Sequence, residues 1–239
     1  MTACIVLTAL GACVLIWYIR EKLRAYSVKA LLLKAAVSTL FVAVGFCGWY
    51  TATRLRGMAA PMGALTVLGL VLGLQGDVWL DLKYVFPEKN APFTYAGFAA
   101  FGVGHVLFLT GLLTQFYLPG NLWRLLVPFV LGGLLSLANL ALERPMKLHY
   151  GRMKPVCLVY GFLLFSTVLT AGSLALLHGW QEQTLNLFFL GAILFALSDL
   201  VLSGTYFGKG RERPRDLIAN YVLYYGGQFL IAFSLLFLS

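Results

Sequence analysis

Four ionisable side chains lie inside otherwise apolar sequence. Asp77 and Asp81 are four residues apart, His105 follows about two dozen residues later, and Asp199 lies in a distant apolar run. An ionisable group in hydrocarbon costs about 2.5–3.5 kcal/mol on insertion scales, so such groups usually face a bundle interior and mark a functional site. Two carboxyl groups in different environments can serve as general acid and general base. We expect Asp77 and Asp199 to be this pair, with His105 as a third proton carrier.

Two of these residues also have structural explanations. Asp81 lies near the end of its apolar run and is followed by Lys83, a pattern typical of a solvated interfacial pair. His105 follows Gly104, and a single histidine in a helix is often a hydrogen-bonded core residue. Asp81 is therefore expected to be an interfacial residue, and it is retained only as a candidate substrate contact.

Further polar side chains in the apolar runs are candidates for substrate binding. Lys34 and Lys154 lie near predicted helix ends, where a lysine extends to the interface or holds a phosphate as a point charge. Tyr224 and Gln228 share a helix face, and Tyr225 is adjacent to them. We expect these three to position water or substrate, although tyrosine is also common in interfacial aromatic belts.

Composition defines the class of protein. The 239 residues are 60% hydrophobic and only 11% charged, which indicates an integral membrane protein. The net charge of +9 comes from residues in short loops, so it indicates membrane topology and contact with anionic lipids, not nucleic-acid binding. The four cysteines lie in apolar segments without metal-ligand spacing. No nucleophile, zinc or nucleotide motif is present, so no metal or cofactor is expected.

Apolar runs of membrane-spanning length predict an all-α bundle of eight transmembrane helices, forming a single transmembrane domain over residues 1–239. Loops and helix ends after the odd-numbered runs hold fifteen lysines and arginines, whereas the opposite side holds three. The positive-inside rule therefore predicts cytoplasmic basic loops and both termini outside. The eight runs are 3–19, 30–50, 60–82, 93–115, 122–142, 154–177, 184–207 and 216–238.

An internal duplication would explain a further pattern. Gly76–Leu80 matches Ser198–Leu202, Gly102–His105 matches Tyr225–Gln228, and the two candidate lysines also correspond, at offsets between 120 and 123 residues. Two parallel four-helix halves, 1–120 and 121–239, would be related by an axis along the membrane normal. Chance similarity among glycine-rich helices is the alternative explanation.

The blocks together resemble the signature of a known family, the YhhN-like lysoplasmalogenases. The similarity runs from about Lys34 to the C-terminus, and it depends on the order and spacing of the blocks. In this chain the blocks are Gly76-Asp77-x-x-Leu80, Gly97-x-x-x-Phe101-x-x-Gly104-His105, Gly191-x-x-x-Phe195-x-x-Ser198-Asp199-x-x-Leu202 and Tyr224-Tyr225-Gly226-Gly227-Gln228.

This resemblance implies an eight-helix membrane hydrolase that cleaves the vinyl ether of lysoplasmalogens to a fatty aldehyde and a glycerophospho-alcohol. The expected partners are a lysophospholipid substrate and membrane lipids, with no nucleic acid, and the expected location is a bacterial cell membrane. Such hydrolysis needs a proton donor to carbon and a carboxylate that activates water, which fits the aspartate pair. The alternatives are a proton-coupled transporter or a lipid-binding membrane protein that uses the same aspartates.

Overall fold

The computed structural model describes residues 1–56, 60–120, 122–208 and 213–238. Over these residues, eight helices are long and apolar enough to span a membrane, which confirms the predicted all-α class. The helices are α1 (Thr2–Arg24), α2 (Val28–Arg56), α3 (Pro61–Val85), α4 (Asn90–Phe116), α5 (Leu122–Ala141), α6 (Lys154–Leu177), α7 (Gln183–Phe207) and α8 (Pro214–Ser234), with short 3-10 turns η1 (Pro87–Lys89), η2 (Gly151–Met153) and η3 (Leu235–Phe237).

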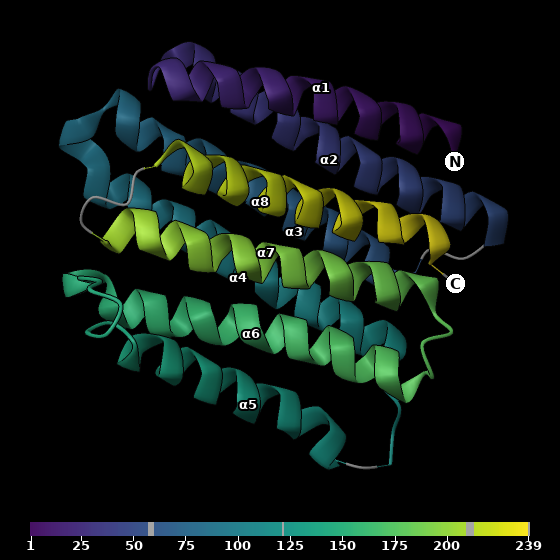
Figure 1. Cartoon of the computed structure of the whole chain (residues 1–239). Helices are drawn as coiled ribbons and strands as arrows, with labels where there is room; N and C mark the ends of the chain where they lie inside the picture. The colour runs from purple at the N-terminus through teal and green to yellow at the C-terminus, as the bar shows by residue number, and fades with distance from the viewer. Residues whose placement is uncertain (57–59, 121, 209–212, 239) are drawn as a thin grey trace.

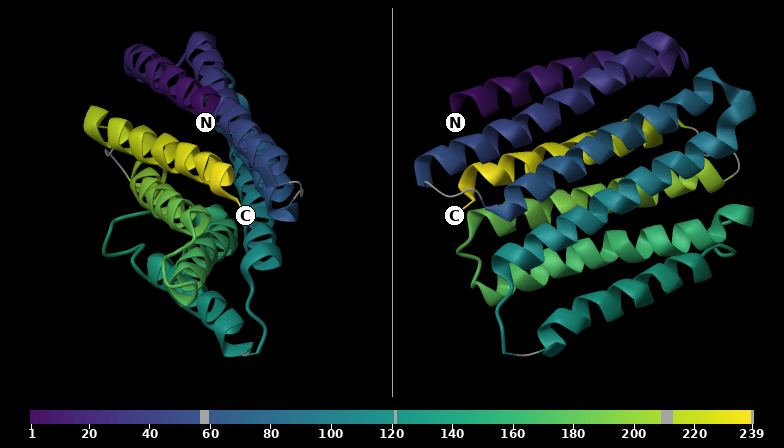
Figure 2. Two further views of the ribbon diagram at one scale, coloured as in Figure 1. Left: turned by 90° about the vertical axis from the view of Figure 1, so that its right-hand side faces the viewer. Right: turned by 180° about the vertical axis from the view of Figure 1, so that it is seen from behind.

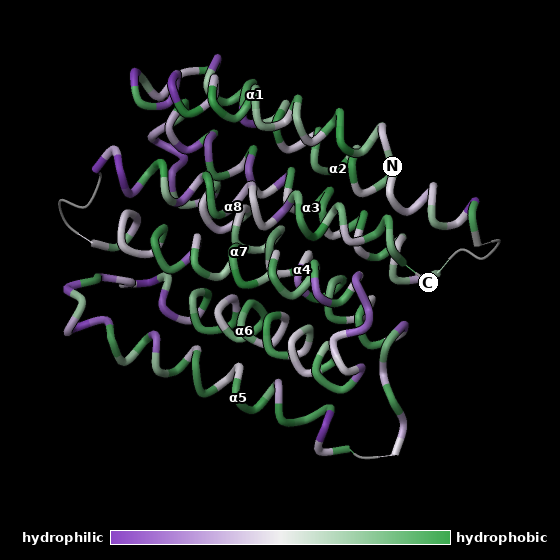
Figure 3. Tube along the Cα trace, turned by 45° about the vertical axis from the view of Figure 1, so that its right-hand side comes forward, coloured by the Kyte–Doolittle hydropathy of each residue, from purple (hydrophilic) through white to green (hydrophobic). Residues whose placement is uncertain are grey.

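The helices run back and forth between two ends of the bundle. Both termini lie at one end, and α1, α3, α5 and α7 finish at the other, as the views from front and back show (Figures 1 and 2). Hydrophilic residues are concentrated at this second end (Figure 3). The side of the membrane that each end faces stays a prediction; Lys209 and Arg211, which contribute to it, lie outside the described residues.

Helices α1 and α2 extend furthest beyond the apolar runs that predicted them. Helix α1 continues to Arg24 instead of ending at residue 19, and α2 covers Val28–Arg56 instead of 30–50. An apolar run is read as ending at the first charged residue, but a charged side chain can remain in a helix when the protein supplies its partner. Lys22 does so: it lies in the last turn of α1 and is only 4% exposed.

Helix neighbours repeat between the two halves of the chain. Helix α1 packs on α2, α2 on α3 and α3 on α4, and the same order recurs as α5 on α6, α6 on α7 and α7 on α8. The halves meet where α2 packs on α8 and where α4 packs on α6. If the two halves are exchanged, each of these contacts becomes the other. Two equivalent four-helix repeats would have this neighbour pattern. The duplication itself stays a prediction.

Small residues set the close crossings of α3 with α4 and of α7 with α8. A Cβ on Gly104 would lie 3.2 Å from the Gly69 carbonyl oxygen, and a Cβ on Gly191 would lie 2.7 Å from the Gly227 carbonyl oxygen. The backbones therefore approach as closely as small residues allow in membrane helix packing. These pairs correspond at offsets of 122 and 123 residues.

Side-chain hydrogen bonds next to Asp199 also stabilise the crossing of α7 with α8. The Ser198 hydroxyl donates to the Asn220 carbonyl at 3.1 Å, and the Asn220 amide donates to the Ser198 carbonyl at 2.9 Å. These bonds join α7 to α8 one residue before the aspartate. Gly76 precedes Asp77 on α3 as Ser198 precedes Asp199 on α7, so a small residue comes before each aspartate.

Candidate active site

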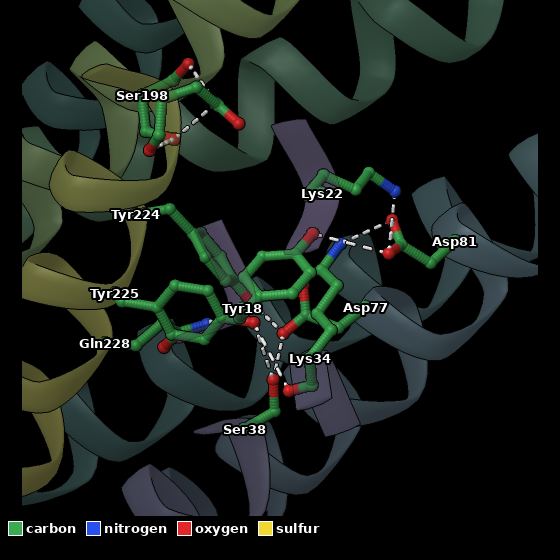
Figure 4. Close-up of polar contacts among 11 residues, drawn as sticks. Tyr18, Lys22, Lys34, Ser38, Asp77, Asp81, Ser198, Tyr224, Tyr225 and Gln228 are labelled. Atoms are coloured by element: carbon green, nitrogen blue, oxygen red, sulfur yellow. Dashed lines mark hydrogen bonds and ion pairs between the residues drawn. The ribbon is translucent and has the colours of Figure 1, made fainter. Parts of the chain in front are cut away.

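Asp77 is a buried carboxylate with three polar partners. It is 2% exposed, and its Oδ2 accepts hydrogen bonds from the Ser38 hydroxyl at 2.6 Å and the Tyr224 hydroxyl at 2.8 Å. Its Oδ1 lies 3.3 Å from the Lys34 ammonium nitrogen. Helices α2, α3 and α8 therefore hold one carboxylate with a cation and two hydroxyl donors (Figure 4).

Lys34 links Asp77 to the aspartate one turn further along α3. Its ammonium group is also 3.3 Å from Asp81 Oδ1, and Asp81 Oδ2 lies 2.9 Å from the Lys22 nitrogen and 3.3 Å from the Tyr18 hydroxyl. Two buried lysines thus balance two buried aspartates (Figure 4).

The expectation for Asp81 is corrected by this arrangement. Asp81 is 3% exposed and pairs with Lys22 from α1 and Lys34 from α2, so it is not the solvated partner of Lys83. The sequence pattern pointed to a lysine two residues along the chain, whereas the bundle supplies cations from two other helices. Asp81 therefore has its charge neutralised inside the protein.

Helix α8 supplies a second layer behind Asp77. The Tyr225 hydroxyl lies 3.1 Å from the Ser38 hydroxyl, and the Gln228 amide donates to the Tyr224 hydroxyl at 3.2 Å. The Gln228 carbonyl oxygen is buried and has no hydrogen-bond partner among the described residues. Of the three predicted residues of α8, Tyr224 therefore holds the carboxylate directly, and Tyr225 and Gln228 orient the two hydroxyl groups that donate to it.

Asp199 has different surroundings. It is half-buried on α7 and accepts a hydrogen bond from the Tyr160 hydroxyl on α6. No lysine or arginine of the described residues forms an ion pair with it. The two aspartates that the sequence paired thus differ in the feature that matters for acid–base work, because one faces a cation and the other faces a phenol.

A cavity of about 90 Å³ brings the two carboxyl groups together. Asp77 and Asp199 both line it, along with Lys34, Tyr160 and Tyr224. Most of the remaining lining is apolar and includes Leu80, Phe98, Phe101, Leu164, Phe165 and Leu202. A water molecule needs roughly 10–15 Å³ measured in this way, so the cavity has room for water beside an apolar chain.

His105 lies behind the cavity wall. Its Nδ1 is 3.2 Å from the Thr167 hydroxyl, and its ring centre is 5.8 Å from that of Tyr160 and 5.1 Å from that of Phe195. Its Nε2 is buried without a hydrogen-bond partner in the described part of the chain. His105 is therefore placed to support Tyr160 and is not among the residues that line the cavity.

Lys154 is the predicted site residue that the structure separates from the others. Its side chain is 52% exposed and pairs with Glu143 at 2.6 Å at the start of α6. Lys34, its proposed counterpart, is buried between two aspartates. The two lysines therefore have different environments, and only Lys34 belongs to the buried cluster.

Four residues of the site were not selected from the sequence: Tyr18, Lys22, Ser38 and Tyr160. Ser38 lies one helical turn after Lys34, so it shares a face with a residue that was selected. Tyr160 follows Ser38 by 122 residues, the offset between the two aspartates. If the proposed duplication is applied to α2 and α6, it points to Ser38 as a partner of Asp77 and to Tyr160 as the partner of Asp199. No comparable signal identifies Tyr18 or Lys22.

The fold and site together define an integral membrane protein whose eight helices enclose a carboxyl-lined apolar cavity. Residues 30–235 match the model of the YhhN family, and the chain belongs to that family, which includes lysoplasmalogenases. No curated protein and no solved structure gives a significant match. Among the described residues, no three histidine, cysteine or acidic side chains gather as metal ligands.

Proposed function

We propose that this protein hydrolyses the vinyl ether bond of lysoplasmalogens, releasing a fatty aldehyde and a glycerophospho-alcohol. The observation that carries the proposal is the pairing of an ion-paired carboxylate, Asp77, with a carboxyl group that lacks a cationic partner, Asp199, on the wall of one apolar cavity. Family membership supports the same substrate class.

Asp199 is the proton donor in this mechanism. A carboxylate without a cation is costly to keep inside a membrane protein, so a carboxyl that holds its proton suits this position. Asp199 transfers that proton to the outer carbon of the vinyl group, and the electrons of the double bond form the new carbon–hydrogen bond. The carbon attached to oxygen becomes an oxocarbenium ion, as in glycoside hydrolysis.

Asp77 stabilises this cation and activates water. Lys34, Ser38 and Tyr224 keep Asp77 in its charged form and fix its orientation, so it needs little reorganisation when positive charge develops. Water adds to the oxocarbenium carbon and gives its proton to Asp77. The resulting hemiacetal collapses as Asp199 takes the proton of its hydroxyl group and Asp77 gives its proton to the departing glycerol oxygen. This step forms the aldehyde and the free alcohol and returns both carboxyl groups to their starting states.

The test is aldehyde release from purified protein reconstituted in lipid vesicles. Asp77→Asn and Asp199→Asn are each expected to lower turnover by about 10²–10⁴-fold, the usual range for loss of a general acid or base. Asp216→Asn makes the same chemical change at the start of α8, outside the cavity lining and at a side chain that is 35% exposed, and is expected to retain activity. Near-normal turnover in both folded cavity variants would refute the proposal.

A further inference from the structure

Tyr150 presents a polar group that the proposed mechanism does not use. Its side chain is 3% exposed and lines the cavity, yet its hydroxyl has no hydrogen-bond partner among the described residues. Buried hydroxyl groups are normally hydrogen-bonded, so an exception at the wall of a cavity indicates a partner that occupies the cavity.

The loop that carries Tyr150 is fastened to the bundle. The Tyr150 amide donates to the Glu143 carboxylate at 3.1 Å, and the His149 amide donates to the Phe207 carbonyl at 2.8 Å. The Tyr150 and Phe207 rings pack with their centres 4.7 Å apart, and Glu143 is itself held by Lys154. These contacts hold the Tyr150 ring at the cavity wall.

Two more polar side chains lie beside this hydroxyl. Burial raises the pKa of the Tyr150 phenol, and polar interactions with the Asn139 and Ser203 side chains oppose that rise, although neither side chain reaches hydrogen-bond geometry with the Tyr150 hydroxyl. Both residues also line the cavity. A protonated phenol, an amide and a hydroxyl offer donors and acceptors together, the combination that recognises an alcohol group.

The position of this polar group relative to Asp199 matches the geometry of a lysolipid. Ser203 follows Asp199 by four residues on α7, so the two share a face about 6 Å apart along the axis, with Ser203 closer to the basic end of the bundle. In a lysoplasmalogen the vinyl carbon that accepts the proton and the free glycerol hydroxyl are five bonds apart, or roughly 6 Å when extended.

We propose that Tyr150, Asn139 and Ser203 form a subsite that binds the free glycerol hydroxyl of the substrate and so selects lysolipids over lipids acylated at that position. The inference deepens the proposed function and rests on it. An acylated oxygen has no proton to donate, and its acyl chain would have to occupy the space next to the loop. The loop also carries exposed Arg144, Lys147 and Arg152 at the surface, where the neighbouring phosphate would lie.

The experiment is a cycle that combines one enzyme change with one substrate change. Tyr150→Phe removes only the phenol oxygen, and a matched vinyl ether lipid carries hydrogen in place of the glycerol hydroxyl. For the natural lysolipid, Tyr150→Phe is expected to lower kcat/KM about tenfold; for the deoxy lipid the change is expected to stay within roughly twofold. Tyr95→Phe, whose hydroxyl contacts the Arg152 carbonyl outside the cavity, is the matched control.

The outcomes separate the two proposals. An equal loss of kcat/KM on both substrates, or no loss on either, would overturn the subsite while leaving vinyl ether hydrolysis intact, because wild-type protein would still release aldehyde. Absence of aldehyde from both substrates with wild-type protein would overturn the proposed function and the subsite with it. A tenfold loss confined to the hydroxyl-bearing lipid would support both.

Discussion

Asp81→Asn offers a quantitative test of the buried charge cluster. In the wild-type protein Lys22 and Lys34 balance Asp77 and Asp81. The substitution keeps the shape of the side chain and removes one negative charge, so the interior carries one uncompensated positive charge. We expect this variant to fold with reduced stability.

The size of the effect follows from the distances. Two unit charges 2.9 Å apart, as in Lys22–Asp81, attract by about 6 kcal/mol at an effective dielectric constant of 20. The Lys34–Asp81 pair at 3.3 Å contributes about 5 kcal/mol on the same scale. Desolvation offsets much of this attraction, and removal of one partner from a buried pair typically costs about 3–5 kcal/mol. We therefore expect the free energy of unfolding to fall by about 3–5 kcal/mol.

The assay is reversible unfolding in mixed micelles with increasing denaturing detergent, followed by circular dichroism. Lys22→Met/Asp81→Asn restores charge balance, since Lys34 keeps Asp77, and is expected to recover most of the lost stability. Lys29→Met is the matched surface control: its pair with Glu21 is also 2.9 Å long, but the lysine side chain is 57% exposed, so the expected loss is below about 1 kcal/mol.

Two results would refute this reasoning. Asp81→Asn could unfold at the wild-type detergent fraction, which would mean that the two ion pairs contribute nothing net. Alternatively, the double variant could be as unstable as Asp81→Asn, which would mean that unbalanced charge is not the cause of the lost stability.

Three further predictions concern helix packing, the proton donor and the cavity loop. Gly191→Ala places a Cβ 2.7 Å from a facing carbonyl oxygen and should lower the unfolding free energy by about 1–3 kcal/mol, whereas Gly226→Ala, with its nearest contact at 3.6 Å, should change it little in the same unfolding assay. Tyr160→Phe removes the hydrogen bond to Asp199 and should lower kcat for aldehyde release about tenfold with a smaller change in KM; unchanged kinetics would exclude Tyr160 as a positioning residue. Hydrogen bonds from Lys154 and from the Tyr150 backbone amide lower the pKa of Glu143. The stabilisation of the loop by charged Glu143 is therefore complete above the unfolded pKa near 4.5 and is lost as pH falls through the lower pKa of the folded state. Hydrogen exchange of the loop should accelerate only in that acidic range.

The fold was largely predictable because hydrophobicity alone identifies membrane spans. Each of the eight apolar runs corresponds to one of the eight long helices of the described residues. The differences are confined to the ends, where Lys22 remains helical because Asp81 supplies its partner. Asp77 and Asp199 were identified because a carboxyl in an apolar run is conspicuous, and the structure places both on the same cavity.

The rest of the site depends on contacts between distant segments. Asp81 was assigned to the interface because its cations come from two other helices and cannot be paired with it by sequence position. Sequence position does not point to Tyr150, since it lies in a polar loop and reaches the cavity only because that loop folds back onto Phe207. Residues of this kind need three-dimensional information.

The most direct test of the central claim is to follow solvent isotopes through the reaction of wild-type protein. In D₂O, with immediate reduction of the aldehyde, one deuterium is expected on the carbon next to the carbonyl carbon, because the acid delivers a solvent-exchanged proton there. In ¹⁸O-labelled water, the glycerophospho-alcohol is expected to contain no label, because water attacks the alkenyl carbon. Aldehyde without that deuterium, or ¹⁸O in the released alcohol, would contradict carboxyl-catalysed protonation of the vinyl ether.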